Sequence, residues 1–274
     1  GSEMCIRDSY RVSAAGQDFA LRCFLRDTSD QEQRYQLISK FVCNDDLAST
    51  VNFEFIGEGI RVNGRWFPVL KMQWVQGVTL ESYVRDHLDQ PEKLHEVADR
   101  FVEMCADLRR VGVAHGDLQH GNVMVSDGEL RLVDYDGMFV PEMQGMESHE
   151  LGHPNYQHPG RNASHFGAYL DSFSAWVIFV SLRSIALDPS LYDALAAGDD
   201  CFLFRGDDLQ QPLYSRAFWL LENHANTEIA DMAKFLRFQL GQELESVPAL
   251  DSGMSDVAEL PELVPPPFPL DPLE

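Results

Sequence analysis

The sequence has few basic residues and no long apolar run. Its 274 residues include 21 Lys and Arg against 44 Asp and Glu, and the formal net charge is −23. Nucleic acids and anionic membrane surfaces are bound through clustered Lys and Arg, so we expect neither as a partner. The longest apolar run, Ala175–Val180, is far shorter than the roughly 20 residues of a membrane span. The N-terminus also lacks the apolar core of a secretory signal.

The cysteines form no paired pattern. An odd number of them, with no Cys-x-x-Cys pair, argues against a disulfide framework and against a zinc ribbon. Reduced thiols are the simpler interpretation, and they favour a cytoplasmic location. The five cysteines are Cys5, Cys23, Cys43, Cys105 and Cys201.

The remaining composition is that of a folded protein with two atypical ends. Apolar residues make up 45% of the chain and aromatic residues 11%, which is enough for one or two cores. Residues 1–9 have neither a strand nor a helix pattern, and we treat them as a leader that is either not native or disordered. Residues 246–274 contain six acids, three consecutive prolines and no Lys or Arg, so we expect a disordered or extended tail.

The stretch 113–137 carries the most informative residues. It contains Asp117 and, five residues further on, Asn122, and a second carboxylate, Asp134, follows an apolar run. An Asp-Gly pair between two short apolar runs separates Asn122 from Asp134, and this pattern is a strong signal for a β-hairpin. We therefore expect the hairpin to bring Asn122 and Asp134 side by side.

These three side chains suit phosphoryl transfer. A transferring phosphoryl group needs positioning and charge neutralisation more than covalent chemistry. Asp117 could orient an acceptor hydroxyl, while Asn122 and Asp134 offer the oxygen ligands that hold Mg²⁺ on phosphates. The alternative is a structural role, because Asp and Asn in loops commonly cap turns.

The stretch resembles the catalytic loop and the metal-binding Asp-Phe-Gly segment of protein-kinase-like enzymes. The shared pattern is His-x-Asp at 115–117, then Asn122, then Asp134 after a strand. Gly116 stands where many protein kinases have Arg, and Tyr135-Asp136 stand where they have Phe-Gly. The His-Gly-Asp-Leu opening is also similar to aminoglycoside and choline kinases, so this stretch leaves both protein and small-molecule acceptors open.

The N-terminal part resembles the smaller kinase lobe more loosely. Strand patterns flank a turn at Gly16, and the second strand contains Phe19-Ala20-Leu21-Arg22. This order resembles the Val-Ala-Ile-Lys strand of kinases, whose Lys binds phosphate oxygens. The resemblance implies that Arg22 holds phosphate and that Ala20 and Met124 enclose adenine. Without the flanking motifs, an Arg on the solvent face of a strand would be ordinary.

A helix and two further strands are expected to complete this lobe. The helix begins near Asp30, has Tyr35 on its apolar face and fits the kinase regulatory helix, so the resemblance makes Glu32 the partner of Arg22. The strand patterns at 53–60 and 65–74 are joined by an Asn-Gly hairpin signal.

Residues 71–77 resemble the kinase hinge, in which backbone groups bond adenine. By that match Met72 is the gatekeeper, and Gln73 and Val75 offer the backbone contacts.

The second half of the chain predicts a mainly helical lobe. Helical spacing occurs at 91–108, 169–182, 191–197, 214–222 and 227–240. Residues 151–159 resemble the end of a protein-kinase activation segment, and Asp171 matches the Asp that braces the catalytic-loop backbone. These two matches favour a protein kinase over an aminoglycoside-type kinase.

The segment His149-Glu150-Leu151-Gly152-His153 has the His-Glu-x-x-His pattern of zinc proteases. That chemistry requires a helix, so that both imidazoles lie on one face. Gly152 is a poor helix residue, and Pro154 disfavours a helical conformation at His153. We therefore do not expect a zinc site here.

Together these patterns predict an α+β protein with a bilobal protein-kinase-like fold. Residues 10–76 form a smaller lobe around a small antiparallel β-sheet, and residues 77–245 form a mainly helical lobe with the catalytic loop. The resemblance implies an ATP- and Mg²⁺-dependent phosphotransferase, with Ser or Thr of a protein substrate as the expected acceptor. No glycine-rich loop precedes Arg22, so we expect the smaller lobe to be truncated in this chain, the natural protein to extend upstream, and ATP to bind weakly.

Two other functions fit parts of the pattern. A pseudokinase that acts as a binding module is favoured by Arg22 in place of Lys and by the absent glycine-rich loop. A small-molecule kinase is favoured by the His-Gly-Asp-Leu opening and by Gln119, which stands where protein Ser/Thr kinases usually have Lys.

Overall fold

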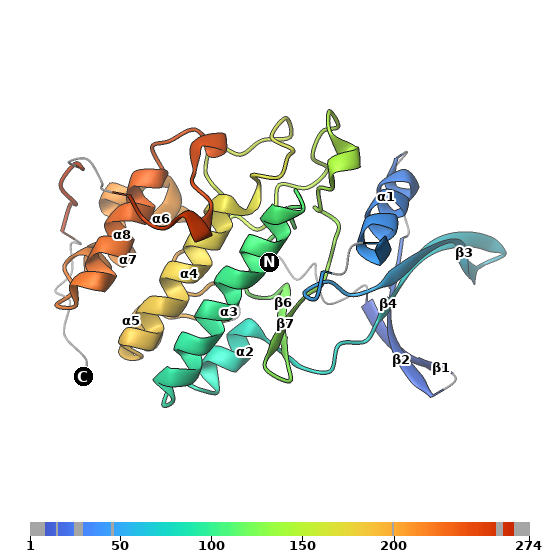
Figure 1. The fold of residues 1–274 in the computed structure, drawn as a ribbon, viewed down its shortest axis with the longest axis horizontal. Coiled ribbons are helices and arrows are strands. Elements are labelled where there is room, and N and C mark those ends of the chain that lie inside the picture. Colours follow the sequence, from blue (N-terminus) through green and yellow to red (C-terminus); the bar gives the residue numbers. More distant parts are fainter. Residues whose placement is uncertain are drawn as a thin grey trace.

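The computed structural model describes residues 9–14, 16–24, 30–44, 47–198, 200–255 and 260–265. Over these residues the chain forms two lobes, a small β-sheet with one helix and a larger set of helices (Figure 1). The predicted leader lies outside the described residues except for Ser9, whose backbone begins the first strand.

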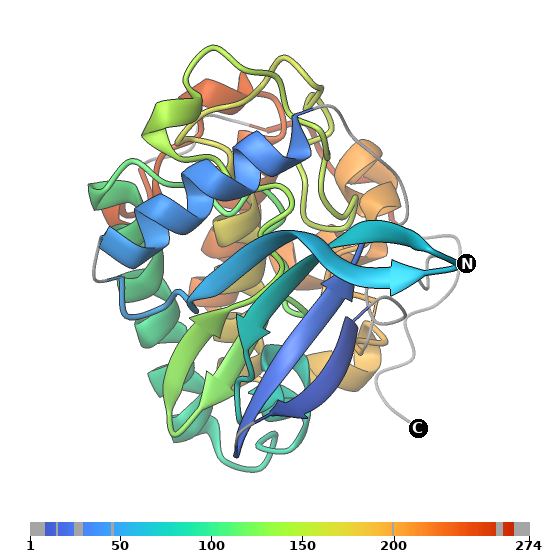
Figure 2. The same cartoon turned by 90° about the vertical axis from the view of Figure 1, so that its right-hand side faces the viewer.

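The smaller lobe contains a four-stranded antiparallel sheet with the order β1-β2-β4-β3. Its second hairpin turns at Asn63 and Gly64, which both have positive φ angles, as the Asn-Gly pair predicted. Figure 2 shows this sheet from the side that faces away from the larger lobe. The strands are β1 (Ser9–Ala14), β2 (Gln17–Cys23), β3 (Phe53–Val62) and β4 (Arg65–Gln73).

Helix α1 (Gln31–Asn44) packs on this sheet (Figure 2) and also contacts the larger lobe. Tyr35 lies among aromatic rings that come from the sheet and its flank, those of Phe24, Phe53 and Phe55. Arg34, one residue earlier, is buried and donates to the carbonyl oxygen of Glu147 at 2.7 Å. The helix is therefore attached on both sides.

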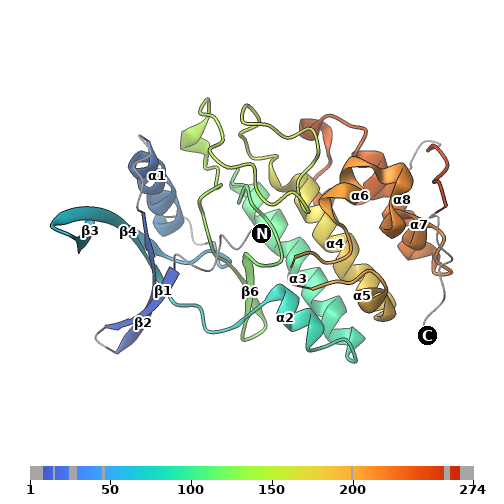
Figure 3. The same ribbon diagram turned by 180° about the vertical axis from the view of Figure 1, so that it is seen from behind.

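The chain enters the larger lobe through Gly77 and a second small sheet. A Cβ on Gly77 would lie 2.3 Å from the carbonyl oxygen of Val125, so only glycine fits this crossing. The sheet has the order β5-β6-β7, and Figure 3 shows β6 between the helices and the first sheet. Its strands are β5 (Val78–Thr79), β6 (Val123–Ser126) and β7 (Glu129–Leu132).

The larger lobe is helical, as its apolar periodicity predicted. Helix α4 is almost wholly buried and packs against α3 and α8. Within the described residues, no helix is long and apolar enough to cross a membrane. The helices are α2 (Leu80–Arg85), α3 (Pro91–Arg110), α4 (Asp171–Leu187), α5 (Ser190–Ala194), α6 (Gly206–Gln210), α7 (Arg216–Glu222) and α8 (Thr227–Gln239). Short 3-10 turns occur at Pro141–Met143, Pro212–Tyr214, Leu244–Ser246 and Leu250–Ser252.

Around Leu250 the tail is folded against the helices, so a disordered or extended chain is not what the structure shows there. Leu250 is buried, and the indole Nε1 of Trp176 donates to the carbonyl oxygen of Pro248 at 2.8 Å. Arg237 in α8 donates to the carbonyl oxygen of Pro261 at 2.8 Å. The acidic, proline-rich composition of the tail does not predict these contacts, because they involve one apolar side chain and two backbone carbonyl groups. Residues 256–259 and 266–274 lie outside the described residues.

Candidate functional site

The β6–β7 hairpin brings Asn122 and Asp134 to the same end, as its sequence predicted. The amide of Val133 donates to the carbonyl oxygen of Asn122 at 3.0 Å, which continues the strand pairing beyond Val123 and Leu132. Asp134 follows with a φ of 64°, a left-handed conformation that is uncommon for any residue but glycine.

Asp117 is held by three hydrogen bonds to its carboxylate. The backbone amide of His153 donates to Oδ1 at 2.7 Å. The side-chain amides of Gln119 and Asn122 donate to Oδ2 at 2.8 and 3.1 Å. The Asn122 nitrogen also donates to the Asp117 carbonyl oxygen at 2.9 Å. Asp117 and Asn122 are therefore in direct contact, and their orientations are fixed together.

Gly116 allows the loop of Asp117 to lie against the loop that follows Asp134. Its φ is 76°, and a Cβ at this position would lie 1.9 Å from the carbonyl oxygen of Gly137. Ala114 and Phe139 exchange backbone hydrogen bonds of 3.1 and 2.8 Å across the same contact. This close approach leaves no room for the Arg that many protein kinases have at position 116.

Asp171, the first residue of α4, braces the Asp117 loop, as the sequence resemblance implied. Its carboxylate accepts hydrogen bonds from the backbone amides of His115 and Gly116, the latter at 2.8 Å. Burial raises the pKa of Asp171, and the two amide donors act in the opposite direction. The ring of His115 also contacts the carbonyl oxygen of Val133 at 2.9 Å, so the loop is tied to both the hairpin and α4.

Arg22 reaches from β2 to the residues after the hairpin. Its Nη1 lies 2.7 Å from Asp134 Oδ1, and its Nη2 lies 2.5 Å from Asp136 Oδ2. Burial disfavours its charge, but the two carboxylates outweigh burial and raise the pKa of Arg22. The implied pair with Glu32 is wrong for this structure, because Glu32 is exposed and accepts a hydrogen bond from Gln36 at 3.0 Å. Glu32 lies on the exposed face of α1, whereas Tyr35 lies on the face that packs on the sheet.

The residues assigned to adenine come from both sheets. Ala20 in β2 is paired with Met72 in β4, and Met124 lies in β6. Ala20 and Val75 are partly buried against the core. The backbone amide of Gln73 donates to the carbonyl oxygen of Asn52 at 3.2 Å, so this N–H is already engaged.

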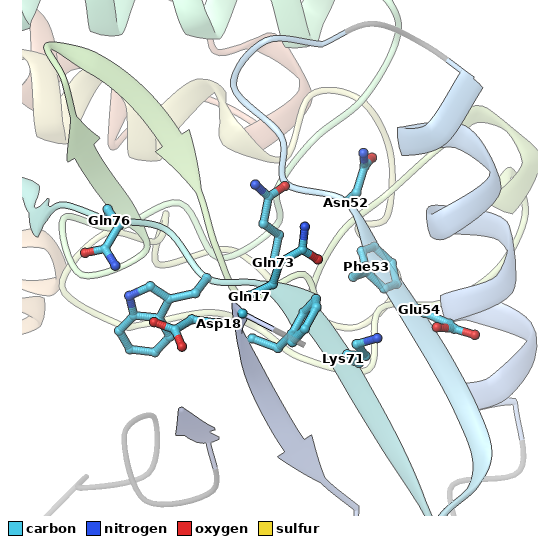
Figure 4. A pocket seen from close by; sticks show the side chains of 11 residues that line it. Gln17, Asp18, Asn52, Phe53, Glu54, Lys71, Gln73 and Gln76 are labelled. Carbon is cyan, nitrogen blue, oxygen red and sulfur yellow. The ribbon is translucent and has the colours of Figure 1, made fainter. Parts of the chain in front are cut away.

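Two cavities adjoin the hinge segment, residues 71–77. The larger, about 670 Å³, is lined by amide and aromatic side chains that include Gln17, Asn52, Gln73 and Trp74 (Figure 4). The second, about 440 Å³, shares part of this lining and also includes Val75. Asp117, Asn122 and Asp134 line neither cavity, so both spaces adjoin the predicted hinge contacts but not the carboxylates.

Two acidic residues near this site were not assigned a role from the sequence. Burial, followed by the charge of Asp134, raises the pKa of Asp136 to about 6. Glu150 has surface open to solvent, but crowding by the surrounding protein and the charges of Asp136 and Asp134 raise its pKa to about 7. The sequence signals Asp136 as a departure from the kinase pattern, in which Gly stands at this position, but does not show what it contacts. Glu150 belongs to the zinc-like segment, and its sequence context gives no other signal.

The zinc-like segment has none of the geometry of that motif. Residues 149–153 are not helical. The ring of His149 lies 3.1 Å from Asp30 Oδ1, whereas a ring nitrogen of His153 faces the backbone amide of Asn155 at 3.3 Å. In the part of the chain that the structure describes, no group of three His, Cys, Asp or Glu side chains is arranged to hold a metal ion.

A magnesium ion nevertheless fits the donors present at the hairpin end. Asn122 uses its side-chain nitrogen to bond Asp117, which leaves the amide oxygen as a ligand. Asp134 contacts Arg22 through Oδ1, and its other carboxylate oxygen has the hard character that Mg²⁺ prefers. One or two protein oxygens with substrate phosphates and waters are the usual ligands of Mg²⁺.

The two lobes, the hairpin with Asn122 and Asp134, and the loop braced by Asp171 define a protein-kinase-like fold. Among solved structures, the chain is similar to the kinase PK-1 of Cydia pomonella granulovirus, with a TM-score of 0.52 and 15% sequence identity over 85% of this chain and 82% of that chain. No protein-family model and no curated protein matches the sequence. The predicted bilobal fold is therefore confirmed.

Proposed function

We propose that this protein is an ATP- and magnesium-dependent phosphotransferase that acts on a hydroxyl group, with Ser or Thr of a protein as the acceptor. The observation that supports it is the direct contact between Asp117 and Asn122, at the end of a hairpin whose other end carries Asp134 in an ion pair with Arg22. These are the residues that the sequence pattern assigned to phosphoryl transfer.

Asp117 orients the acceptor hydroxyl in this proposal. A carboxylate that accepts hydrogen bonds from His153, Gln119 and Asn122 has little rotational freedom. Fixed orientation is what positions an attacking oxygen in line with the phosphoryl group. Its carboxylate oxygens have about four acceptor sites, so three hydrogen bonds leave capacity for the hydroxyl proton.

Arg22, Asn122 and Asp134 hold the nucleotide phosphates. Asn122 and Asp134 bind magnesium, which supplies charge neutralisation on the phosphates when it is bound. Arg22 has five N–H donors in a planar fork, so its contacts with carboxylates leave further donors for phosphate oxygens. Ala20 and Met124 enclose adenine, and Gln73 and Val75 contribute backbone contacts.

Phosphate transfer is tested by incubating the protein with ATP and magnesium, with and without a mixture of proteins, and detecting phosphate by mass spectrometry. We expect phosphate on Ser or Thr residues, and none when Asp117→Asn replaces the wild type. Asp231→Asn is the matched control, because Asp231 is an exposed acid on α8. Absence of transfer by the wild type to every acceptor would contradict the proposal.

A small-molecule acceptor is the second candidate, and Gln119 favours it. Its amide donates to the Asp117 carboxylate, so the position places a neutral group beside the acceptor site where protein Ser/Thr kinases usually have a cation. Transfer to small alcohols or amino alcohols in the same mass-spectrometric assay, without transfer to proteins, would favour this function.

A binding module without catalysis is the third candidate. It is favoured by the engagement of Arg22 with two carboxylates. Calorimetric binding of ATP without any transfer would distinguish this function from the other two.

A further inference from the structure

An ion-pair network joins the two lobes at Arg22. Its Nη2 pairs with Asp136 at 2.5 Å and its Nη1 with Asp134 at 2.7 Å. The Arg22 side chain is 25% exposed, and that of Asp136 is only 12% exposed. Charges in such partly desolvated surroundings interact more strongly than pairs on an open surface.

Tyr35 extends this network to α1. Its hydroxyl donates to Asp136 Oδ1, while its ring stacks on Phe55 at 5.4 Å. Burial and the charge of Asp136 raise the pKa of Tyr35, so the hydroxyl remains protonated and stays a donor. Asp136 thus uses one oxygen for α1 and the other for Arg22.

We propose that Asp136, oriented by Tyr35, positions Arg22 for the nucleotide phosphates. This inference rests on the proposed function. The resemblance assigned the orienting carboxylate to Glu32 on α1, but Glu32 is exposed and bonds Gln36. The helix contributes a hydroxyl in its place, and the carboxylate comes from the segment after the hairpin, two residues beyond Asp134.

The geometry explains why a carboxylate is needed at this position. A guanidinium on a long side chain has many rotamers, and ordering it only on binding would weaken the affinity for phosphate. Asp136 contacts Nη2 of Arg22 and so holds the guanidinium group in place before the nucleotide binds. Nη1 has two hydrogens, so its contact with Asp134 leaves a donor, and Nε is a further donor. Arg22 can therefore contact phosphate without leaving Asp136.

The test compares binding of ATP with magnesium and binding of adenosine by calorimetric titration. In Asp136→Asn we expect ATP affinity to fall about tenfold, as for loss of one charge-assisted contact. Adenosine affinity should stay within about twofold, because adenosine has no phosphate for Arg22 to hold. Tyr35→Phe keeps the ring packing and should lower ATP affinity about threefold. A general loss of folding would weaken both ligands alike, so the contrast separates positioning from stability.

A matched control removes the same charge from another Arg–Asp pair. Asp251 pairs with Arg109 in the larger lobe, and Asp251→Asn should leave both affinities unchanged. In a background of Arg22→Met, Asp136→Asn should change ATP affinity by less than about twofold, since it acts through Arg22.

Three results would overturn the inference. They are unchanged ATP affinity in Asp136→Asn, tighter ATP binding in that variant, or an undiminished effect in the Arg22→Met background. Tighter binding would mean that Asp136 withholds Arg22 from phosphate. If instead the wild type bound neither ATP nor adenosine, the proposed function itself would fail.

Discussion

At the scale of single residues, the proposed function assigns the acceptor to one carboxylate and the nucleotide to another group of side chains. Asp117 contacts Gln119, Asn122 and the backbone of His153, whereas Asp134 contacts Arg22. A metal ligand contributes binding free energy in the ground state, while a group that orients the acceptor stabilises mainly the transition state. The two carboxylates should therefore respond differently to the same substitution.

We expect Asp134→Asn to remove magnesium-dependent ATP binding. Asp117→Asn should retain binding within about threefold and lose transfer, because it does not hold the metal. Calorimetric titration of both variants, with transfer measured in parallel, checks this. Equal loss of binding in the two variants would contradict the division of roles.

Gly116 is expected to be irreplaceable for a steric reason. Gly116→Ala combines a φ of 76° with a Cβ 1.9 Å from the Gly137 oxygen, and we expect a loss of about 2–4 kcal/mol in the free energy of unfolding. Gly145 has a φ of 90°, and no atom lies within 4 Å of the position that a Cβ would take there, so Gly145→Ala should cost only about 1 kcal/mol. Denaturant unfolding of both variants measures the two losses in the free energy of unfolding, and their difference gives the cost of the clash. Equal losses would contradict this prediction.

Glu150 should make stability depend on pH. Its pKa in the folded protein is about 7, above its ordinary value, so the folded state binds the proton more tightly than the unfolded state. The contribution of protonated Glu150 to the free energy of unfolding is therefore present at low pH and is lost as the pH rises through 7. Glu150→Gln should raise the melting temperature relative to wild type more at pH 8 than at pH 5. A difference that is the same at both pH values would contradict this assignment.

At the scale of elements, the segment between Gly137 and Gly152 is held in place by the fold. Its sole hydroxyl side chain, Ser148, is buried and donates to the carbonyl oxygen of Glu150 at 2.5 Å. Arg161 donates to the backbone of Gly116 and of Glu150, at 2.6 and 3.2 Å. The segment is thus attached to the Asp117 loop by hydrogen bonds already present in this structure.

We therefore expect activity to be independent of phosphorylation in this segment. In many protein kinases an Arg before the catalytic Asp binds a loop phosphate, and Gly116 stands at that position here. Ser148→Ala should leave the rate of transfer within about tenfold of wild type, since it removes one hydrogen bond but no charge-assisted contact. A larger fall in a variant that keeps the wild-type melting temperature would contradict this prediction.

At the scale of the whole molecule, the charge balance is the main feature. A net charge of −23 produces self-repulsion in the compact state, and salt screens it with a Debye length of about 10 Å at 0.1 M. Most of the ion pairs that salt would weaken are on the surface, where each contributes little.

We expect the melting temperature to rise by about 2–4 °C between low salt and 0.5 M sodium chloride, which corresponds to about 1 kcal/mol in a chain of this size. Thermal unfolding at several salt concentrations measures it. A fall with salt would show that the ion pairs, including those of Arg22, outweigh the repulsion.

Local sequence patterns were sufficient to predict the hairpins, the buried helix and the residues that suit phosphoryl transfer. Asn63-Gly64 and Asp127-Gly128 have positive φ angles that their residue types favour, so both hairpins follow from local conformation. The apolar run of α4 required burial, and the spacing of Asp117, Asn122 and Asp134 around a hairpin determined that they come together.

The contacts between residues far apart in the sequence could not be predicted in this way, because they depend on how the elements pack. Arg22 lies 112 positions from Asp134, and its pairing with Asp136 and not with Glu32 depends on which face of α1 packs on the sheet. The docking of the residues around Leu250 depends on a surface that α3 and α4 form together. Such contacts arise from packing between elements, and local propensity contains no information about them.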